Sequence, residues 1–151
     1  MRSTLTVGLL LLLAGCCGSL PEDLPSLIGD LGCSTDMGVK HCVVKKISRQ
    51  YGASGLLQAL QSENPCTRSE AAHGLRSFKQ ERVVAALLER LRDEDPHVRM
   101  WAAYSLGDIG DATGLPSLAA LEKDVNFVAM AAKTAESSIR QREAASASGR
   151  R

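Results

Sequence analysis

The stretch from Asp93 to Asp111, DEDPHVRMWAAYSLGDIGD, decides the fold of this chain. Asp95 is a suitable N-cap, and Pro96 stands at the first helical position, where the missing N–H of proline costs nothing. The apolar residues that follow are spaced by four, four and three positions and line one face of a helix: Val98, Ala102, Leu106 and Ile109. We expect Gly107 and Gly110 to end this helix.

The same pattern recurs along the chain with a period of 31 residues. Pro65 stands 31 positions before Pro96, and a third copy starts at Asp124, 31 positions after Asp93. Between the copies lie further apolar segments with helical spacing, RVVAALLERL and LPSLAALEK. A period of this size is typical of stacked two-helix units. The sequence therefore predicts an all-α fold, a short α-solenoid of about three helix-hairpin repeats.

The run D-x-D-P-x-V-R-x-x-A-A-x-x-L-G-x-I-G-D at residues 93–111 resembles the HEAT-like repeats first named from phycobilisome-lyase proteins. The resemblance covers residues 64–142. It implies that loop aspartates and helix arginines form a ladder along the stack, with these candidates here: Asp93, Asp124, Arg68 and Arg99. The first unit has Thr67 and Arg76 where the pattern has Val and Gly, and the third has Ala129 for Arg. The expected ladder is therefore one or two rungs long.

The N-terminus reads as a targeting segment, residues 1–15, that lies outside the fold. Its apolar run, residues 7–14, is too short to span a bilayer as a helix. It ends in LAGC, residues 13–16, which resembles the lipobox of bacterial lipoproteins. That resemblance implies that Cys16 becomes the first residue and carries acyl chains, whereas the alternative is an ordinary secretory signal. The absence of Asp after Cys16 favours the outer membrane, facing the periplasm, if the source is Gram-negative.

The rest of the chain divides into three parts. Residues 16–38 are expected to form a lipid-attached tether and an irregular N-terminal segment, since they are rich in turn residues. Residues 39–143 form the repeat domain, and its first repeat, 39–61, is degenerate and is expected to cover the end of the stack. Residues 144–151 are expected to fray.

Beyond Cys16 and Cys17 the chain has three cysteines, Cys33, Cys42 and Cys66, and an exported protein can keep disulfides. Their odd number leaves at least one free or paired between chains. A Cys33–Cys42 disulfide is the favoured pair, because it would hold the N-terminal segment on the first helix. A Cys42–Cys66 disulfide between repeats is the competitor, and a buried free cysteine is the third interpretation.

Catalytic and metal-binding patterns are missing from the sequence. The three histidines, His41, His73 and His97, fall in different units, and there is no G-x-S-x-G, H-E-x-x-H or P-loop. Some enzymes with HEAT repeats bind iron through His-Glu dipeptides, which this chain lacks. We therefore expect no enzyme, no metal and no cofactor. The net charge of +1 also disfavours nucleic-acid binding.

The candidate interaction residues are Trp101, Met100, Arg68 and Arg99. Trp101 is the only tryptophan and stands one step off the apolar stripe, so it either anchors a partner or packs against the neighbouring repeat. The favoured function is a membrane-anchored, non-catalytic scaffold that binds a protein with its repeat surface. The alternatives are a lyase-like enzyme or enzyme subunit, suggested by family analogy, and a structural lipoprotein that forms homo-oligomers by stacking repeats end to end.

Overall fold

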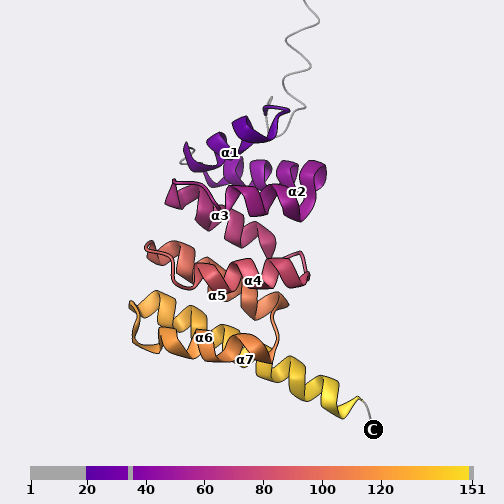
Figure 1. The fold of residues 1–151 in the computed structure, drawn as a ribbon, viewed down its shortest axis with the longest axis vertical. Helices are drawn as coiled ribbons and strands as arrows, with labels where there is room; N and C mark the ends of the chain where they lie inside the picture. The colour runs from indigo at the N-terminus through magenta and orange to yellow at the C-terminus, as the bar shows by residue number, and fades with distance from the viewer. Residues whose placement is uncertain (1–19, 34–35, 150–151) are drawn as a thin grey trace, which may run out of the picture.

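The computed structural model describes residues 20–33 and 36–149, which form a stack of helices (Figure 1). The helices are α1 (Leu24–Cys33), α2 (Met37–Ala59), α3 (Pro65–Leu75), α4 (Glu81–Arg90), α5 (Pro96–Ile109), α6 (Leu115–Ala119) and α7 (Asn126–Ser148). Short 3-10 turns, η1 (Ala112–Gly114) and η2 (Ala120–Lys123), flank α6. Within these two ranges the chain has no strand. The fold is an all-α solenoid, as the 31-residue period predicts.

The predicted first repeat, residues 39–61, is a pair of helical segments that α2 joins at a kink. Gly52, at the kink, has φ 60° and ψ −152°, a backbone conformation that glycine adopts far more readily than other residues. The first half of α2 then lies along α3. Lys40 lies 3.5 Å from Glu70, and Val44 packs at Gly74, both with an offset of 30 residues. The two halves of α2 thus form a repeat whose turn is the kink.

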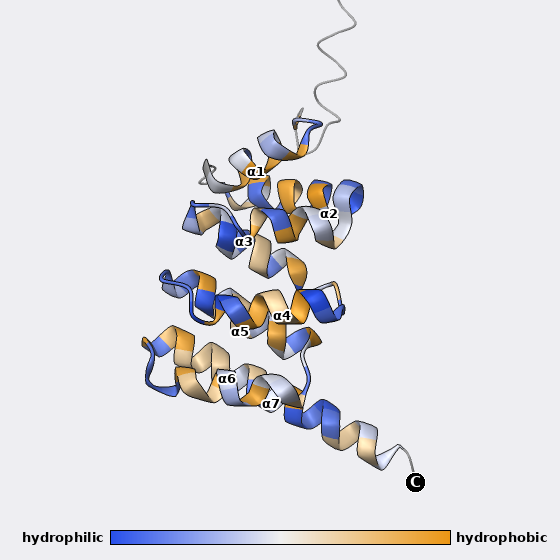
Figure 2. Ribbon diagram, in the orientation of Figure 1, coloured by the Kyte–Doolittle hydropathy of each residue, from blue (hydrophilic) through white to orange (hydrophobic). Residues whose placement is uncertain are grey.

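α1 corrects the expectation that residues 16–38 are irregular. Leu27 and Leu31 of this helix are fully buried, and α1 packs on α2 and α3 at one end of the stack. Asp23 accepts a hydrogen bond from the Ser26 N–H at 2.9 Å and so marks the start of the helix. Turn residues obscured a leucine spacing of four positions. α1, rather than the first repeat, therefore covers the apolar end (Figure 2).

Small residues let α3, α5 and α7 approach closely. Buried alanines occur in each of these helices: Ala71, Ala72, Ala102, Ala103, Ala131, Ala132 and Ala135. Gly107 lies against α7, and a Cβ atom added to it would stand 2.9 Å from Ala135 Cα. Gly107 thus lies inside α5 and permits close packing; it does not end the helix as expected. Gly110 is the C-cap, as predicted.

α7 corrects the expectation of a frayed tail at residues 144–151, because the helix runs to Ser148. Arg142 donates hydrogen bonds to the carbonyl oxygens of Gly107 and Gly110, the second at 2.7 Å. These are among the last carbonyls of α5, which the helix itself leaves without partners. Arg142 therefore fastens the end of α7 to α5, and the alanines that follow favour further helix.

The structure tests one of the two disulfide pairs that the sequence analysis considered. Cys42 is buried and disulfide-bonded, and Cys66 is a free, exposed cysteine, so the Cys42–Cys66 pair is excluded. The side chain of Cys33 lies outside the described residues, and the Cys33–Cys42 pair stays a prediction. Cys16 and the whole targeting segment also lie outside them. In the part of the chain that the structure describes, no helix has both the length and the apolar character to cross a bilayer.

Candidate functional site

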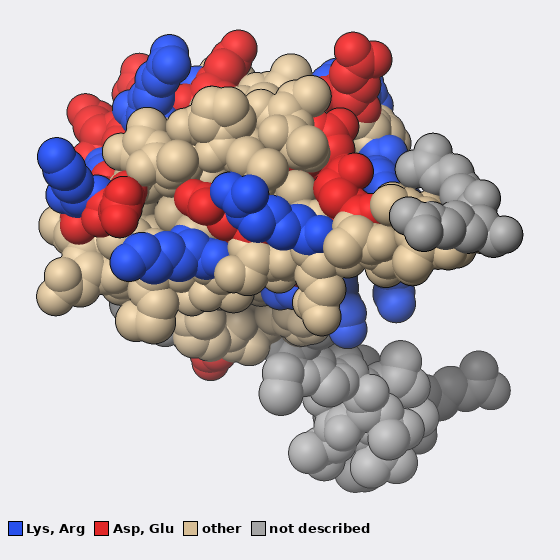
Figure 3. Space-filling model, turned by 90° about the horizontal axis from the view of Figure 1, so that it is seen from below, with Lys and Arg blue, Asp and Glu red and all other residues tan. Residues whose placement is uncertain are grey.

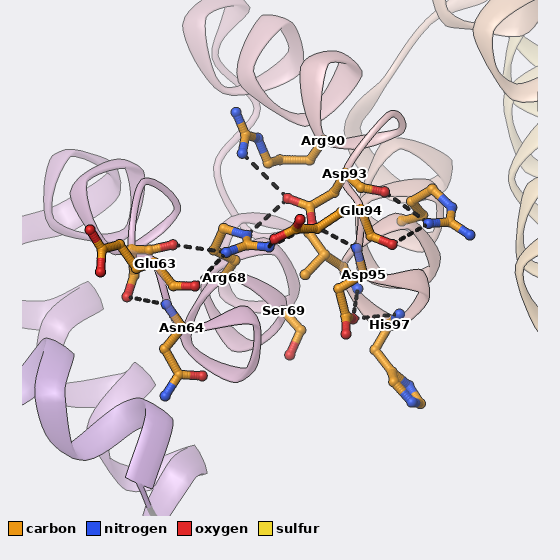
Figure 4. A network of polar contacts seen from close by, with 12 residues as sticks. Glu63, Asn64, Arg68, Ser69, Arg90, Asp93, Glu94, Asp95 and His97 are labelled. Atoms are coloured by element: carbon orange, nitrogen blue, oxygen red, sulfur yellow. Dashed lines mark hydrogen bonds and ion pairs between the residues drawn. The ribbon is translucent and has the colours of Figure 1, made fainter.

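Arg68 of α3 forms a buried two-point ion pair with Asp93 in the loop before α5. Its Nε donates to Asp93 Oδ2 at 2.9 Å and its Nη2 to Oδ1 at 2.8 Å (Figure 4). Its Nη1 donates to the carbonyl oxygens of Ser62 and Glu63, at 3.0 and 2.8 Å. One guanidinium thus ties its own loop to the loop of the next repeat.

The second rung repeats this geometry one unit along the stack. Arg99 donates to both carboxylate oxygens of Asp124, at 2.8 and 2.7 Å, and to the carbonyls of Asp93 and Glu94, at 2.8 and 3.0 Å. The described residues show no further pair of this kind, and α7 has Ala129 at the position that matches Arg99. The ladder is therefore two rungs long, as the sequence analysis expected.

The aspartates of the two rungs are ionised. Burial alone would raise the pKa of Asp93, but hydrogen bonds from Arg68 and the Asp95 N–H, together with nearby arginine charge, outweigh it and lower the pKa. Hydrogen bonds from Arg99 likewise hold the pKa of Asp124 below its usual value. Because the guanidinium groups of Arg68 and Arg99 donate their hydrogen bonds within the ladder, these arginines are structural residues here and not a free docking surface.

Trp101 of α5 lies half-buried in an aromatic cluster, which we define as His73, Trp101 and Tyr104. The ring centroids of His73 and Trp101 are 4.2 Å apart, and those of Trp101 and Tyr104 are 5.9 Å apart. Met100 is also half-buried and packs on the core. Burial, followed by the charge of Arg76, lowers the pKa of His73 and favours a neutral ring. Trp101 thus packs on the neighbouring repeat and remains partly accessible.

Two adjoining hollows surround this cluster. The first, about 430 Å³, lies between the first half of α2 and α3, with Val44 and Phe78 among its apolar lining residues. The second, about 390 Å³, is lined by Arg76, Trp101, Tyr104 and Asp108. Arg76 lines both, and the ring of His73 in the first hollow packs against the ring of Trp101 in the second, tilted by 35°. We call the lining of the two hollows the α2–α3–α5 face.

The charges on the α2–α3–α5 face are only partly balanced. Arg76 donates to Asp108 at 2.7 Å in a half-exposed ion pair. Glu70 faces Lys40 at 3.5 Å. Lys45 and Arg49 line the first hollow, are exposed, and have no ion-pair partner among residues 20–33 and 36–149. Sequence reasoning missed His73, Tyr104, Lys45 and Arg49 as site residues, although Lys45 and Arg49 are spaced by four positions on α2.

The described residues offer no cluster of three or more His, Cys, Asp or Glu side chains that could hold a metal ion.

No curated protein sequence matches the chain. Among solved structures, it is similar to human deoxyhypusine hydroxylase in complex with glycerol, with a TM-score of 0.60 and 21% identity. The alignment covers 80% of this chain and 44% of the hydroxylase chain, so this chain spans less than half of that protein. At this identity the similarity shows the fold alone.

This similarity contradicts the prediction that the chain is not an enzyme. The hydroxylase is an enzyme built on the same kind of helical repeat fold. Neither the fold nor the lack of a short catalytic motif is therefore a reason to exclude catalysis.

The family itself is clear from the comparison with family models. The model for HEAT repeats matches residues 53–148, more than half of the chain, and the chain therefore belongs to the HEAT repeat family.

Proposed function

We propose that the chain is a protein-binding HEAT-repeat module that receives a partner on its α2–α3–α5 face. The observation that carries this proposal is the half-buried Trp101, packed against His73 beside two hollows that share Arg76. The few residues that dominate binding energy at protein interfaces are enriched in tryptophan, tyrosine and arginine and lie in pockets that lose water on binding. Trp101 and Tyr104 of α5 meet Arg76, the C-cap residue of α3, at the second hollow.

We further propose that Cys16 tethers this module to a membrane of the bacterial cell envelope. The support is the lipobox-like LAGC at residues 13–16, which lies outside the described residues. Only seven residues, 17–23, separate Cys16 from the start of α1. Even fully extended, this link reaches roughly 25–30 Å. The repeat domain would therefore meet partners that lie at or near the membrane, with the outer membrane favoured in a Gram-negative cell.

Cross-linking in the native membrane tests the docking surface. The full chain with a C-terminal tag is cross-linked, purified and analysed for bound proteins, and it is compared with Trp101→Ala and with Phe127→Ala. Phe127 is the control, because it is another partly accessible aromatic residue next to a histidine, with its ring centroid 5.2 Å from that of His97. We expect a specific partner that Trp101→Ala loses and Phe127→Ala keeps. A partner retained equally by both variants would reject this face.

The tether has a separate test. Cys16→Ser should move the protein from the detergent-rich phase to the aqueous phase in a detergent partition experiment, because the acyl chains would be lost. Radiolabelled fatty acid should label the wild type and not the variant. A variant that stays in the detergent phase, or a wild type without label, would contradict the lipid anchor while leaving the docking face untouched.

Self-association by end-to-end stacking is the second candidate. The start of α7 exposes three large apolar side chains: Val125, Phe127 and Met130. Figure 3 views the stack from this end, where charged side chains of both signs are interspersed with uncharged residues. Sedimentation of the Cys16→Ser protein decides between the two candidates. A dimer or longer array that Met130→Glu converts to monomer would favour stacking, whereas a monomer at all concentrations would exclude it.

A further inference from the structure

We infer that the segment received by the α2–α3–α5 face is acidic and carries bulky apolar side chains. This inference rests on the proposed function and specifies the chemistry of the partner. Val44 and Phe78 are partly buried against the core and leave an apolar lining in the first hollow. An apolar side chain of the partner that enters this hollow would remove both from water, which is the main source of binding energy at such sites.

Positive charge stands beside this apolar lining. Lys45 and Arg49 are four positions apart on α2, so they lie on the same side of the helix, and both are exposed. Of the described residues that line the first hollow, Glu70 is the one carboxylate, and it already faces Lys40 at 3.5 Å. Among the described residues, these two cationic side chains therefore have no ion-pair partner at the edge of the hollow, in a chain whose total formal charge is only +1.

Carboxylates of a partner complement this arrangement. Charges at the rim of an interface chiefly select partners and accelerate their encounter, while the apolar contacts hold the complex together. A basic segment would meet Lys45 and Arg49 with like charge, and a neutral one would leave both without partners. The combination of an apolar hollow and an unpaired cationic rim thus favours a segment with Asp or Glu next to its apolar residues.

The extent of the face favours a polypeptide over a small amphiphile. Arg76 lines both hollows, and the two together involve three helices from three successive repeats. A small carboxylic acid would fill one hollow and leave Trp101 and Tyr104 uncovered. A peptide can place one apolar residue against Val44 and Phe78 and another against Trp101, with its acidic residues facing the first half of α2.

Selection of peptides from a random library displayed on phage tests the inference. The full chain, purified in detergent, is the target, and the double variant Lys45→Glu, Arg49→Glu is the comparison. Lys123→Glu with Lys133→Glu is the matched control, since both are exposed lysines elsewhere on the stack and the net charge changes equally. We expect the wild type and the control to enrich acidic peptides that contain Leu, Ile, Met or Phe.

The enriched peptides are then synthesised and titrated while the fluorescence of Trp101, the only tryptophan, is followed. We expect binding to shift its emission to shorter wavelength as the ring is covered. In the Lys45→Glu, Arg49→Glu variant, Kd should rise at least tenfold, and affinity of the wild type should fall with added salt. Circular dichroism establishes that each variant is folded.

Three outcomes would overturn the inference: enrichment of neutral or basic peptides, enrichment of nothing above background, or an equal Kd in the charge-reversed and control variants. The cross-linking experiment tests the proposed function separately. If the cross-linked partner still depends on Trp101 when any of these three results is found, the docking face stands and only the acidic chemistry fails. If that dependence is also absent, both fail.

Discussion

Truncating Asp93 to alanine should destabilise the fold more than the same change at Asp124, although the two residues hold equivalent rungs. The side chains of Arg68 and Asp93 are 7% and 3% exposed, whereas those of Arg99 and Asp124 are 17% and 14% exposed. Asp93 also accepts hydrogen bonds from Arg90 and from the Asp95 N–H. Its loss therefore leaves more buried polar groups without a partner.

The burial sets the size of the effect. Removing one partner of a buried ion pair costs about 3–5 kcal/mol, because the other charge stays buried and uncompensated. Arg68 keeps its bonds to the Ser62 and Glu63 carbonyls and lies 3.3 Å from the exposed Glu94, which offsets part of this cost. We therefore expect about 3 kcal/mol for Asp93→Ala. For Asp124→Ala, in the more solvent-exposed pair with Arg99, we expect a loss of about 1–2 kcal/mol in unfolding free energy.

Urea unfolding at pH 7, followed by circular dichroism at 222 nm and by Trp101 fluorescence, measures both free energies. The pair Arg68→Met, Asp93→Leu serves as a control, since replacing both charges with apolar residues should recover much of the loss. An equal or smaller effect of Asp93→Ala relative to Asp124→Ala would refute the argument from burial. A double variant no more stable than Asp93→Ala would show that the cost arises from something other than the stranded guanidinium.

Three further results follow from the structure. The pKa of Asp93 is lowered from its ordinary value of 3.8 in the folded protein. The contribution of the ionised side chain to folding stability should therefore be complete above that pH and lost as the pH falls through the lower folded value. In urea titrations at acid pH, the difference in unfolding free energy between wild type and Asp93→Ala should shrink. Gly52→Ala should lower the free energy of unfolding by about 1–3 kcal/mol, because alanine is strained in the backbone conformation of the kink. Gly29→Ala should raise it by about 1 kcal/mol, because Gly29 is an exposed helical residue with nothing within 4 Å of an added Cβ atom. Equal changes for the two variants in urea unfolding would contradict the kink assignment. Cys66 should react with a thiol reagent in the native, unreduced protein, whereas Cys42 should react only after reduction and unfolding, and mass spectrometry of the labelled peptides would expose the opposite order.

The prediction of the fold succeeded where the signals were local and repeated. The cap at Asp95, followed by Pro96, begins α5 as expected. The prediction failed at α1, where turn residues concealed the buried positions of Leu27 and Leu31. It also failed at the end of α7, which Arg142 holds through carbonyls 32 and 35 residues away. No local pattern reports such a distant contact.

The site was predicted less completely for the same reason. Trp101 was singled out by its rarity, but its stacking on His73 depends on how α3 packs against α5. Arg68 and Arg99 were named both as ladder residues and as docking residues, and burial decided for the ladder. Lys45 and Arg49 looked like ordinary solvated residues of a helix until the hollow beside them was seen.

Short-range signals in the sequence predicted the helices of the repeats and their 31-residue period, because caps, apolar spacing and a fixed period are properties of short segments, and the family resemblance named the residues of the ladder. Only the tertiary structure decided which side chains remain accessible and which charges remain unpaired. Those properties depend on how helices from successive repeats pack on one another: Gly107 against Ala135, Val44 at Gly74, His73 on Trp101. The α2–α3–α5 face exists only where three such repeats meet.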